Sequence, residues 1–223
     1  MVVAMSAYEL FVLNYNYSSW SMRAGILMRF SGAAYRETAI HIDEAGLAEV
    51  RRFSPSGTLP LLSHGGLRIG DSLAIAEYLA EEFPDKPFWP RDRAARALAR
   101  SACAEMHSSF HAMRNTMNMN IRARYPGFPR SPEVDANVRR VQAIWGDLRS
   151  RFAAHGDFLC GEFGIVDAFF APVVMRFRTY DVRLSGELAA YAERVIAHPA
   201  VAGWLEKAAA DPLTVPKYDY VVG

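Results

Sequence analysis

The segment Ser56-Gly57-Thr58-Leu59-Pro60-Leu61-Leu62, followed by Asp71-Ser72 at the start of a helical pattern, constrains the fold more than any other feature. Proline restricts the residue before it to extended conformations, and cis peptide bonds occur almost only before proline. If the Leu59–Pro60 bond is cis, the backbone N–H and C=O of Leu59 turn outward and can pair with an extended peptide. Asp71 and Ser72 would cap a helix, and a helix N-terminus favours a carboxylate ligand. The unit is either a simple strand-turn-helix corner or a site for a carboxylate-bearing peptide, a description that glutathione fits.

Composition limits the class of protein. The chain has 223 residues, enough for one large domain or two small ones, and 51% hydrophobic against 22% charged residues is typical of globular proteins. A formal net charge of +1 gives no electrostatic reason to expect nucleic acid or an anionic membrane as a partner. Cys103 and Cys160 are too few for a disulfide framework or a typical zinc site, so we expect no metal and a reducing compartment, and we assign these thiols no chemistry.

The sequence predicts neither a signal peptide nor a membrane-spanning segment. Residues 1–7 lack the basic region of a signal peptide, and no apolar run approaches the roughly 20 residues that span a bilayer. We therefore expect a cytoplasmic protein.

The hydrophobic period changes once along the chain. Residues 8–83 follow strand and helix patterns in turn, with strands at 8–13, 35–40, 59–63 and 67–69 and helices at 21–31, 44–53 and 73–80. Prolines at 84, 87 and 90 indicate a linker. Beyond it the pattern is helical, at 91 to about 124, 133–155, 164–180, 185–197 and 200–210. The order predicts an α+β protein, with a βαβ-α-ββα domain over residues 1–83 and an all-α domain over residues 91–223.

Four motifs in this order resemble those of the cytosolic glutathione S-transferases. The run Ser18-Ser19-Trp20-Ser21-Met22-Arg23 is similar to the Ser-Ser-Cys-Ser-x-Arg start of the zeta class, and residues 71–79 to its Gln-Ser-Leu-Ala-Ile-x-Glu-Tyr-Leu stretch. Residues 105–110 resemble the Glu-Leu-His-x-x-Phe stretch of the bacterial beta class, and residues 164–167 an interior capping box, usually Ser/Thr-Ile-Ala-Asp. The resemblance spans nearly the whole chain and implies a thioredoxin-like first domain, glutathione as co-substrate, a small electrophile, and a homodimer.

Three departures qualify the resemblance. Trp20 replaces the zeta-class cysteine, which puts maleylacetoacetate isomerase activity in doubt. Thr179 stands near the position of that class's substrate-binding arginine, although Arg176 and Arg178 lie within one helical turn. Gly164 replaces the capping serine or threonine and supplies no side-chain acceptor.

The resemblance also implies roles for residues that bind and activate glutathione. Ser18 is similar in position to the catalytic serine of serine-type transferases, and Ser19 is the competing choice because adjacent serines make a shift of one residue easy. The cysteinyl backbone of glutathione is expected against Leu59-Pro60. Ser72 would hold the γ-glutamyl carboxylate, with Asp71 near the ammonium group.

Further residues are predicted around the electrophile, whose pocket is expected mainly in the helical domain. By resemblance, Glu105 reaches glutathione in the partner subunit and His107 borders the pocket. Arg114 and Arg122 either favour an anionic substrate or face solvent, and His107 is otherwise a packed histidine. The remaining predicted pocket residues are Tyr17, Trp20 and Phe110.

Four other functions remain to be weighed against conjugation. A transferase-fold binding protein without turnover is disfavoured by the intact serine and Asp-Ser motifs. A glutathione-dependent thiol reductase needs a cysteine at the helix start, where position 18 is serine. Isomerisation and dehalogenation within the transferase family stay open, as does the identity of the electrophile.

Overall fold

The first half of the chain is built on a four-stranded mixed sheet. The computed structural model describes residues 7–220, so residues 1–6, on which the expectation about a signal peptide rests, lie outside the described residues. The strands are β1 (Tyr8–Leu13), β2 (Tyr35–Ile40), β3 (Leu61–His64) and β4 (Leu67–Gly70). Their order in the sheet is β2-β1-β3-β4, with β1 parallel to β2 and antiparallel to β3.

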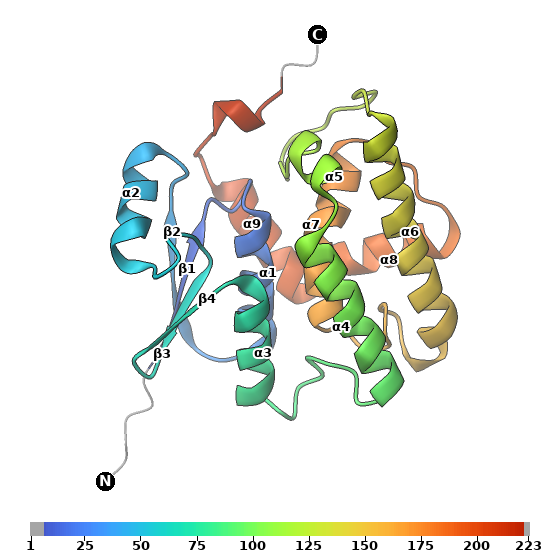
Figure 1. Cartoon of the computed structure of the whole chain (residues 1–223), viewed down its shortest axis with the longest axis horizontal. Helices are drawn as coiled ribbons and strands as arrows, with labels where there is room; N and C mark the ends of the chain where they lie inside the picture. The colour runs from blue at the N-terminus through green and yellow to red at the C-terminus, as the bar shows by residue number, and fades with distance from the viewer. Residues whose placement is uncertain (1–6, 221–223) are drawn as a thin grey trace.

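Three helices cover this sheet. They are α1 (Ser19–Ser31), α2 (Glu44–Phe53) and α3 (Ser72–Glu82). Helices α1 and α3 lie between the sheet and the helical half, whereas α2 covers the opposite face (Figure 1). This is the thioredoxin-like arrangement that the family resemblance implies, and it places the start of α1 beside the second half of the chain.

The second half is helical. Its elements are α4 (Arg93–Ser108), α5 (His111–Thr116), α6 (Pro132–Phe152), η1 (Ala153–His155), α7 (Ile165–Thr179), α8 (Gly186–Ala197), α9 (Pro199–Ala210) and η2 (Pro216–Tyr218). Nearly every residue of α7 is buried, so this helix forms the centre of the half and packs against α1 and α4. Within residues 7–220 no helix is both long and apolar enough to cross a membrane.

The prediction of one helix over 91–124 is wrong beyond Ser108. Phe110 adopts a left-handed backbone conformation with φ of 62°, which interrupts the helix before the short α5. After α5 the chain is irregular, because its backbone groups bond to distant loops instead of to each other. The Arg122 N–H, for example, donates to the Asn16 side chain at 3.0 Å. Such tertiary partners replace helical hydrogen bonds and carry no local sequence signal.

The linker docks on the N-terminus of α7, which explains the glycine at position 164. The Ile165 N–H donates to the Phe88 carbonyl at 2.9 Å, and a Cβ on Gly164 would lie 2.8 Å from that same oxygen. Only a residue without a side chain fits there. The capping box keeps its other half, because the buried Asp167 carboxylate accepts from the Gly164 N–H at 3.0 Å.

A second glycine sets how closely the two halves approach. Gly25 lies inside α1, where glycine is an unfavourable helix former, yet a Cβ at this position would overlap the ring of Trp204 on α9. The indole of Trp204 is almost completely buried, and its Nε1 donates to the Tyr15 carbonyl at 3.1 Å. The glycine is therefore required by packing between the halves.

This packing predicts opposite effects for two Gly→Ala substitutions in helix interiors. Gly146→Ala on α6 meets open space and should stabilise the fold by about 0.5–1 kcal/mol through helix propensity. Gly25→Ala should instead destabilise it by about 1–3 kcal/mol, because overpacking outweighs the propensity gain. Urea unfolding followed by circular dichroism measures both. Equal stabilisation by the two variants would contradict the packing argument.

Candidate active site

Two adjoining cavities, each of about 400 Å³, meet at the start of α1. Both are lined by Leu13, Trp20 and Leu47. The first, here called the cis-proline cavity, is completed by Val50, Gly57, Thr58, Leu59, Pro60, Asp71 and Ser72. The second, here called the arginine cavity, is completed by Tyr17, Ser18, Ser19, Ile42, Arg114, Asn115, Asn118, Met119, Arg176, Lys217 and Tyr218.

The corner before β3 supplies one wall of the cis-proline cavity. The Leu59–Pro60 peptide bond is cis, the conformation on which the sequence prediction depends. Among the described residues, neither the N–H nor the C=O of Leu59 has a hydrogen-bond partner. Both groups are therefore available to an extended peptide that lies along this corner.

Asp71 and Ser72 face the same cavity from the N-terminus of α3. Asp71 has a φ of 73° and caps the helix, its Oδ1 accepting from the Leu73 N–H at 2.7 Å. The Ser72 side chain is fully buried, and within residues 7–220 its hydroxyl has no partner. A buried hydroxyl without a partner is costly, so a ligand oxygen that accepts from it would remove that cost. This helix end is suited to a carboxylate.

Ser18 and Ser19 lie at the other end of the site. Ser18 is the N-cap of α1: its Oγ accepts from the Ser21 N–H at 3.3 Å and its hydroxyl donates to the Ser21 Oγ at 2.9 Å. The Ser19 Oγ instead accepts from the guanidinium of Arg176 at 3.3 Å, and within residues 7–220 the hydroxyl hydrogen of Ser19 has no acceptor. Both serines line the arginine cavity, so the choice between them stays open.

Trp20 is surrounded by cations and by His107. The guanidinium carbons of Arg23 and Arg114 lie 4.6 and 4.5 Å from the centroid of its ring. The His107 ring meets it edge-on, with centroids 5.0 Å apart, and His107 Nε2 lies 3.3 Å from the Asp71 carboxylate. Burial lowers the pKa of His107, and the charges of Arg23 and Arg114 act in the same direction. The Asp71 carboxylate opposes this shift. His107 lines neither cavity, but it connects α4 to Trp20 and Asp71, which line the cis-proline cavity.

Three other residues considered for the site lie outside both cavities in this chain. The Glu105 carboxylate binds Arg140 on α6 through two hydrogen bonds of 2.7 and 2.8 Å, and it lines neither cavity. The Phe110 ring is buried in the core and also lines neither cavity. Arg122, the alternative cation, bonds to the carbonyls of Asp211 and Leu213 near the surface.

Arg176 is the site residue that sequence reasoning did not select. It is 5% exposed, it donates from Nε to the Met117 carbonyl at 2.8 Å, and it reaches Ser19 from the last turn of α7. The only signal in the sequence is its place one turn before Thr179, where the zeta class has an arginine. Lys217 and Tyr218 were also missed, because η2 returns over the boundary between the halves (Figure 1).

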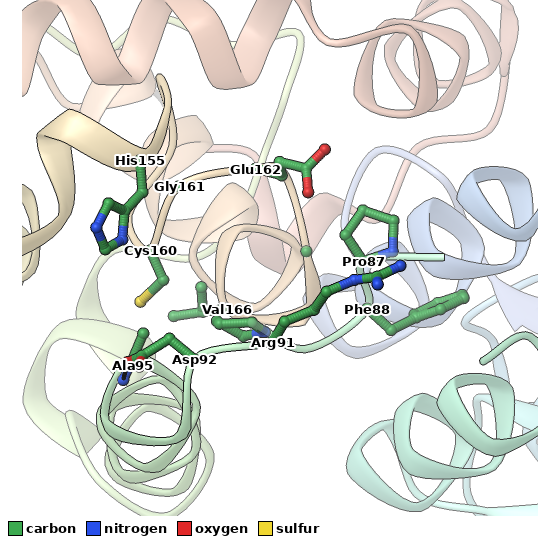
Figure 2. A pocket seen from close by; sticks show the side chains of 12 residues that line it. Pro87, Phe88, Arg91, Asp92, Ala95, His155, Cys160, Gly161, Glu162 and Val166 are labelled. Carbon is green, nitrogen blue, oxygen red and sulfur yellow. Dashed lines mark hydrogen bonds between the residues drawn. The ribbon is translucent and has the colours of Figure 1, made fainter. Parts of the chain in front are cut away.

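A third hollow, of about 150 Å³, lies where the linker meets the N-terminus of α7 (Figure 2). Cys160 and His155 line it. Burial raises the pKa of the Cys160 thiol to about 12, so this sulfur is a poor nucleophile. Cys103 is buried as well, and within residues 7–220 no group of three or more His, Cys, Asp or Glu side chains could hold a metal ion.

Comparison with known proteins agrees with this geometry. The thioredoxin-like half matches the family model for the glutathione S-transferase N-terminal domain over residues 17–82, and the helical half matches the C-terminal domain model over residues 131–207. The fold and the site define a class of protein in which a thioredoxin-like domain with a cis-proline corner is joined to a helical domain. The chain belongs to the glutathione S-transferase family.

Individual relatives are distant. Glutathione S-transferase 1 of Dianthus caryophyllus is 26% identical over 169 residues, which is 75% of this chain and 76% of the relative. A probable maleylacetoacetate isomerase of Vibrio cholerae serotype O1 is 27% identical over 208 residues, or 87% and 94% of the two chains. A crystal structure of a glutathione transferase homolog from Burkholderia gl BGR1, with bound glutathione, shares the fold with a TM-score of 0.73 and 22% identity over 92% of this chain and 100% of that one.

The unpartnered hydroxyl of Ser72 predicts two separate effects of Ser72→Ala. Glutathione affinity should fall by about 10- to 100-fold, the cost of one hydrogen bond to a charged group. The free energy of unfolding of the ligand-free protein should not decrease, because the lost hydroxyl has no partner to leave unpaired. Calorimetric titration and urea unfolding measure the two effects, with the exposed Ser101→Ala as control. Unchanged affinity would remove Ser72 from the binding site.

Proposed function

We propose that the protein binds glutathione in the cis-proline cavity and directs its sulfur at an electrophile in the arginine cavity. The supporting observation is that the two cavities adjoin at Trp20, with Leu59 and Ser72 lining one and two serine hydroxyls lining the other. In conjugation a carbon–sulfur bond forms, the leaving group departs with its bonding electrons, and the thiol proton passes to solvent.

Ionisation of the thiol is the step that the serines would assist. A free thiol has a pKa of about 8.5 and only the thiolate is an effective nucleophile, so lowering this pKa by two units requires roughly 2.7 kcal/mol. One hydroxyl donor to the anion contributes about 1.5–3 kcal/mol. The N-terminus of α1 adds about 0.3–1 kcal/mol. The serine therefore stabilises the nucleophile and is not itself one.

Either serine can supply this hydrogen bond. Ser18 would exchange its bond to the neutral Ser21 hydroxyl for one to an anion, while its oxygen stays the cap of α1. The hydroxyl hydrogen of Ser19 has no acceptor in the described part of the chain, and the nearby Arg176 charge would further favour a thiolate. Positive charge beside a sulfur lowers its pKa.

Glutathione-dependent isomerisation is the second candidate. The likeness to the Vibrio cholerae protein over most of both chains favours it. Trp20 stands where the zeta class has a cysteine, which favours conjugation instead. A cytoplasmic enzyme with a part in detoxification is our proposal for the biological setting, supported by two free cysteines.

The proposed mechanism predicts how Ser18→Ala and Ser19→Ala change ionisation. The serine that contacts sulfur should, on substitution, raise the pKa of bound glutathione by about 1 to 2 pH units, while affinity stays nearly intact. Conjugation should therefore fall most near neutral pH and recover toward the pKa of the free thiol. Thiolate absorbance of the complex, followed against pH, measures this. A wild-type curve equal to that of free glutathione would overturn the mechanism.

Homodimerisation, through α3 and the start of α4, is the oligomeric state that we propose from the family resemblance. Light scattering should give twice the 24.9 kDa of one chain at micromolar concentration. In such a dimer Glu105 would reach glutathione of the partner subunit, so Glu105→Gln should weaken glutathione binding without changing the mass. A stable monomer would remove both proposals.

A further inference from the structure

The arginine cavity carries an excess of positive charge. Arg114, Arg176 and Lys217 line it, and among the described residues no Asp or Glu does. Of the carboxylates beside it, Asp219 accepts from the hydroxyl of the cavity residue Tyr17 at 3.0 Å, and Asp71 lines the adjoining cis-proline cavity and contacts His107. A cavity of this composition attracts anions.

Arg23 adds a buried charge for which the described residues provide no ion pair at hydrogen-bond distance. Its side chain is 2% exposed, and in the described part of the chain its Nε and Nη1 have no hydrogen-bond partner. The guanidinium lies against the rings of Trp20 and Phe169, at 4.6 and 4.7 Å from their centroids. Burial, together with the charges of Arg114 and Arg176, lowers its pKa to about 9, and Cys103 and Asp71 act in the opposite direction. Buried charges are normally paired, so this cluster lacks an anion.

Arg114 is the member of the cluster that can bind a ligand directly. It donates from Nη1 to the carbonyls of His107 and Ser109, at 3.1 and 3.4 Å, which fixes the side chain over Trp20. Its Nε and Nη2 make no hydrogen bond within residues 7–220. These two groups form one edge of the planar fork that binds a carboxylate through two parallel hydrogen bonds.

We infer that the electrophile carries a carboxylate, which Arg114 binds through Nε and Nη2 while Arg176 and Arg23 stabilise its charge. This inference rests on the proposed function, since it names the class of substrate for the same site. Arg176 contacts Ser19 and lines the cavity together with Arg114, so a carboxylate at Arg114 leaves the rest of the molecule beside the two serines. The reacting carbon would then face the glutathione sulfur.

A matched pair of electrophiles tests the charge preference. In 4-chloro-3,5-dinitrobenzoate and its methyl ester, the thiolate forms a carbon–sulfur bond at the ring carbon and chloride leaves with the bonding electrons. Each kcat/KM is divided by the rate of the uncatalysed reaction with glutathione, which removes the difference in intrinsic reactivity. The wild type should prefer the carboxylate by about tenfold or more. Preference for the ester would overturn the inference.

Two variants test whether Arg114 causes the preference for the carboxylate over the ester. Arg114→Gln keeps the length and polarity of the side chain but removes its charge, and it should bring the acid-to-ester ratio close to one. Arg178→Gln is the matched control, because Arg178 is an exposed arginine on α7 outside the arginine cavity. It should leave the ratio unchanged. Equal ratios in wild type and Arg114→Gln would contradict the role of Arg114.

Binding of unreactive analogues tests the preference for a carboxylate independently of the proposed transferase activity. Calorimetry with 3,5-dinitrobenzoate and 3,5-dinitrobenzamide, in a buffer of low ionic strength, measures the anion preference without turnover. Tighter binding of the acid, reduced in Arg114→Gln, would support the anion site even if neither electrophile were conjugated, a result that would contradict the transferase function alone. Equal binding of acid and amide would overturn the inference.

Discussion

The close contact between α1 and the helical half is the constraint on which the rest of the structure depends. Gly25 lets the Trp204 ring lie directly on the backbone of α1, and α7 packs against the same helix. A packed interior tolerates few changes in such a contact. The position of Ser18 and Ser19 relative to α7 follows from it, because both residues stand at the beginning of α1.

Trp20, at the start of α1, positions the charged side chains around the candidate site. It lines both cavities, and its ring holds Arg23, Arg114 and His107 around the point where they meet. A cysteine, as in the zeta class, could not orient these groups in this way, since it has no aromatic face for cations. The substitution therefore changes how the site is organised as well as which chemistry it favours.

The charge distribution separates the two cavities chemically. The cis-proline cavity offers backbone groups at Leu59 that have no partner among the described residues, a hydroxyl at Ser72 and a carboxylate at Asp71. This combination is suited to a zwitterionic peptide. The arginine cavity offers cations and hydroxyl groups. Positive charge close to the serines favours a thiolate and an anionic second substrate at the same time, so nucleophile activation and substrate selection draw on the same arginines.

Local features of the sequence determined the two-part fold and predicted the residues of one of the two candidate cavities. The strand and helix periods, the Leu59–Pro60 corner and the Asp71-Ser72 cap depend on neighbouring residues, so their patterns are visible in the chain itself. The break after Ser108 and the approach of Arg176 to Ser19 were decided only by the tertiary structure. They depend on partners that are distant in sequence, and periodicity cannot reveal which remote group satisfies a buried donor or charge.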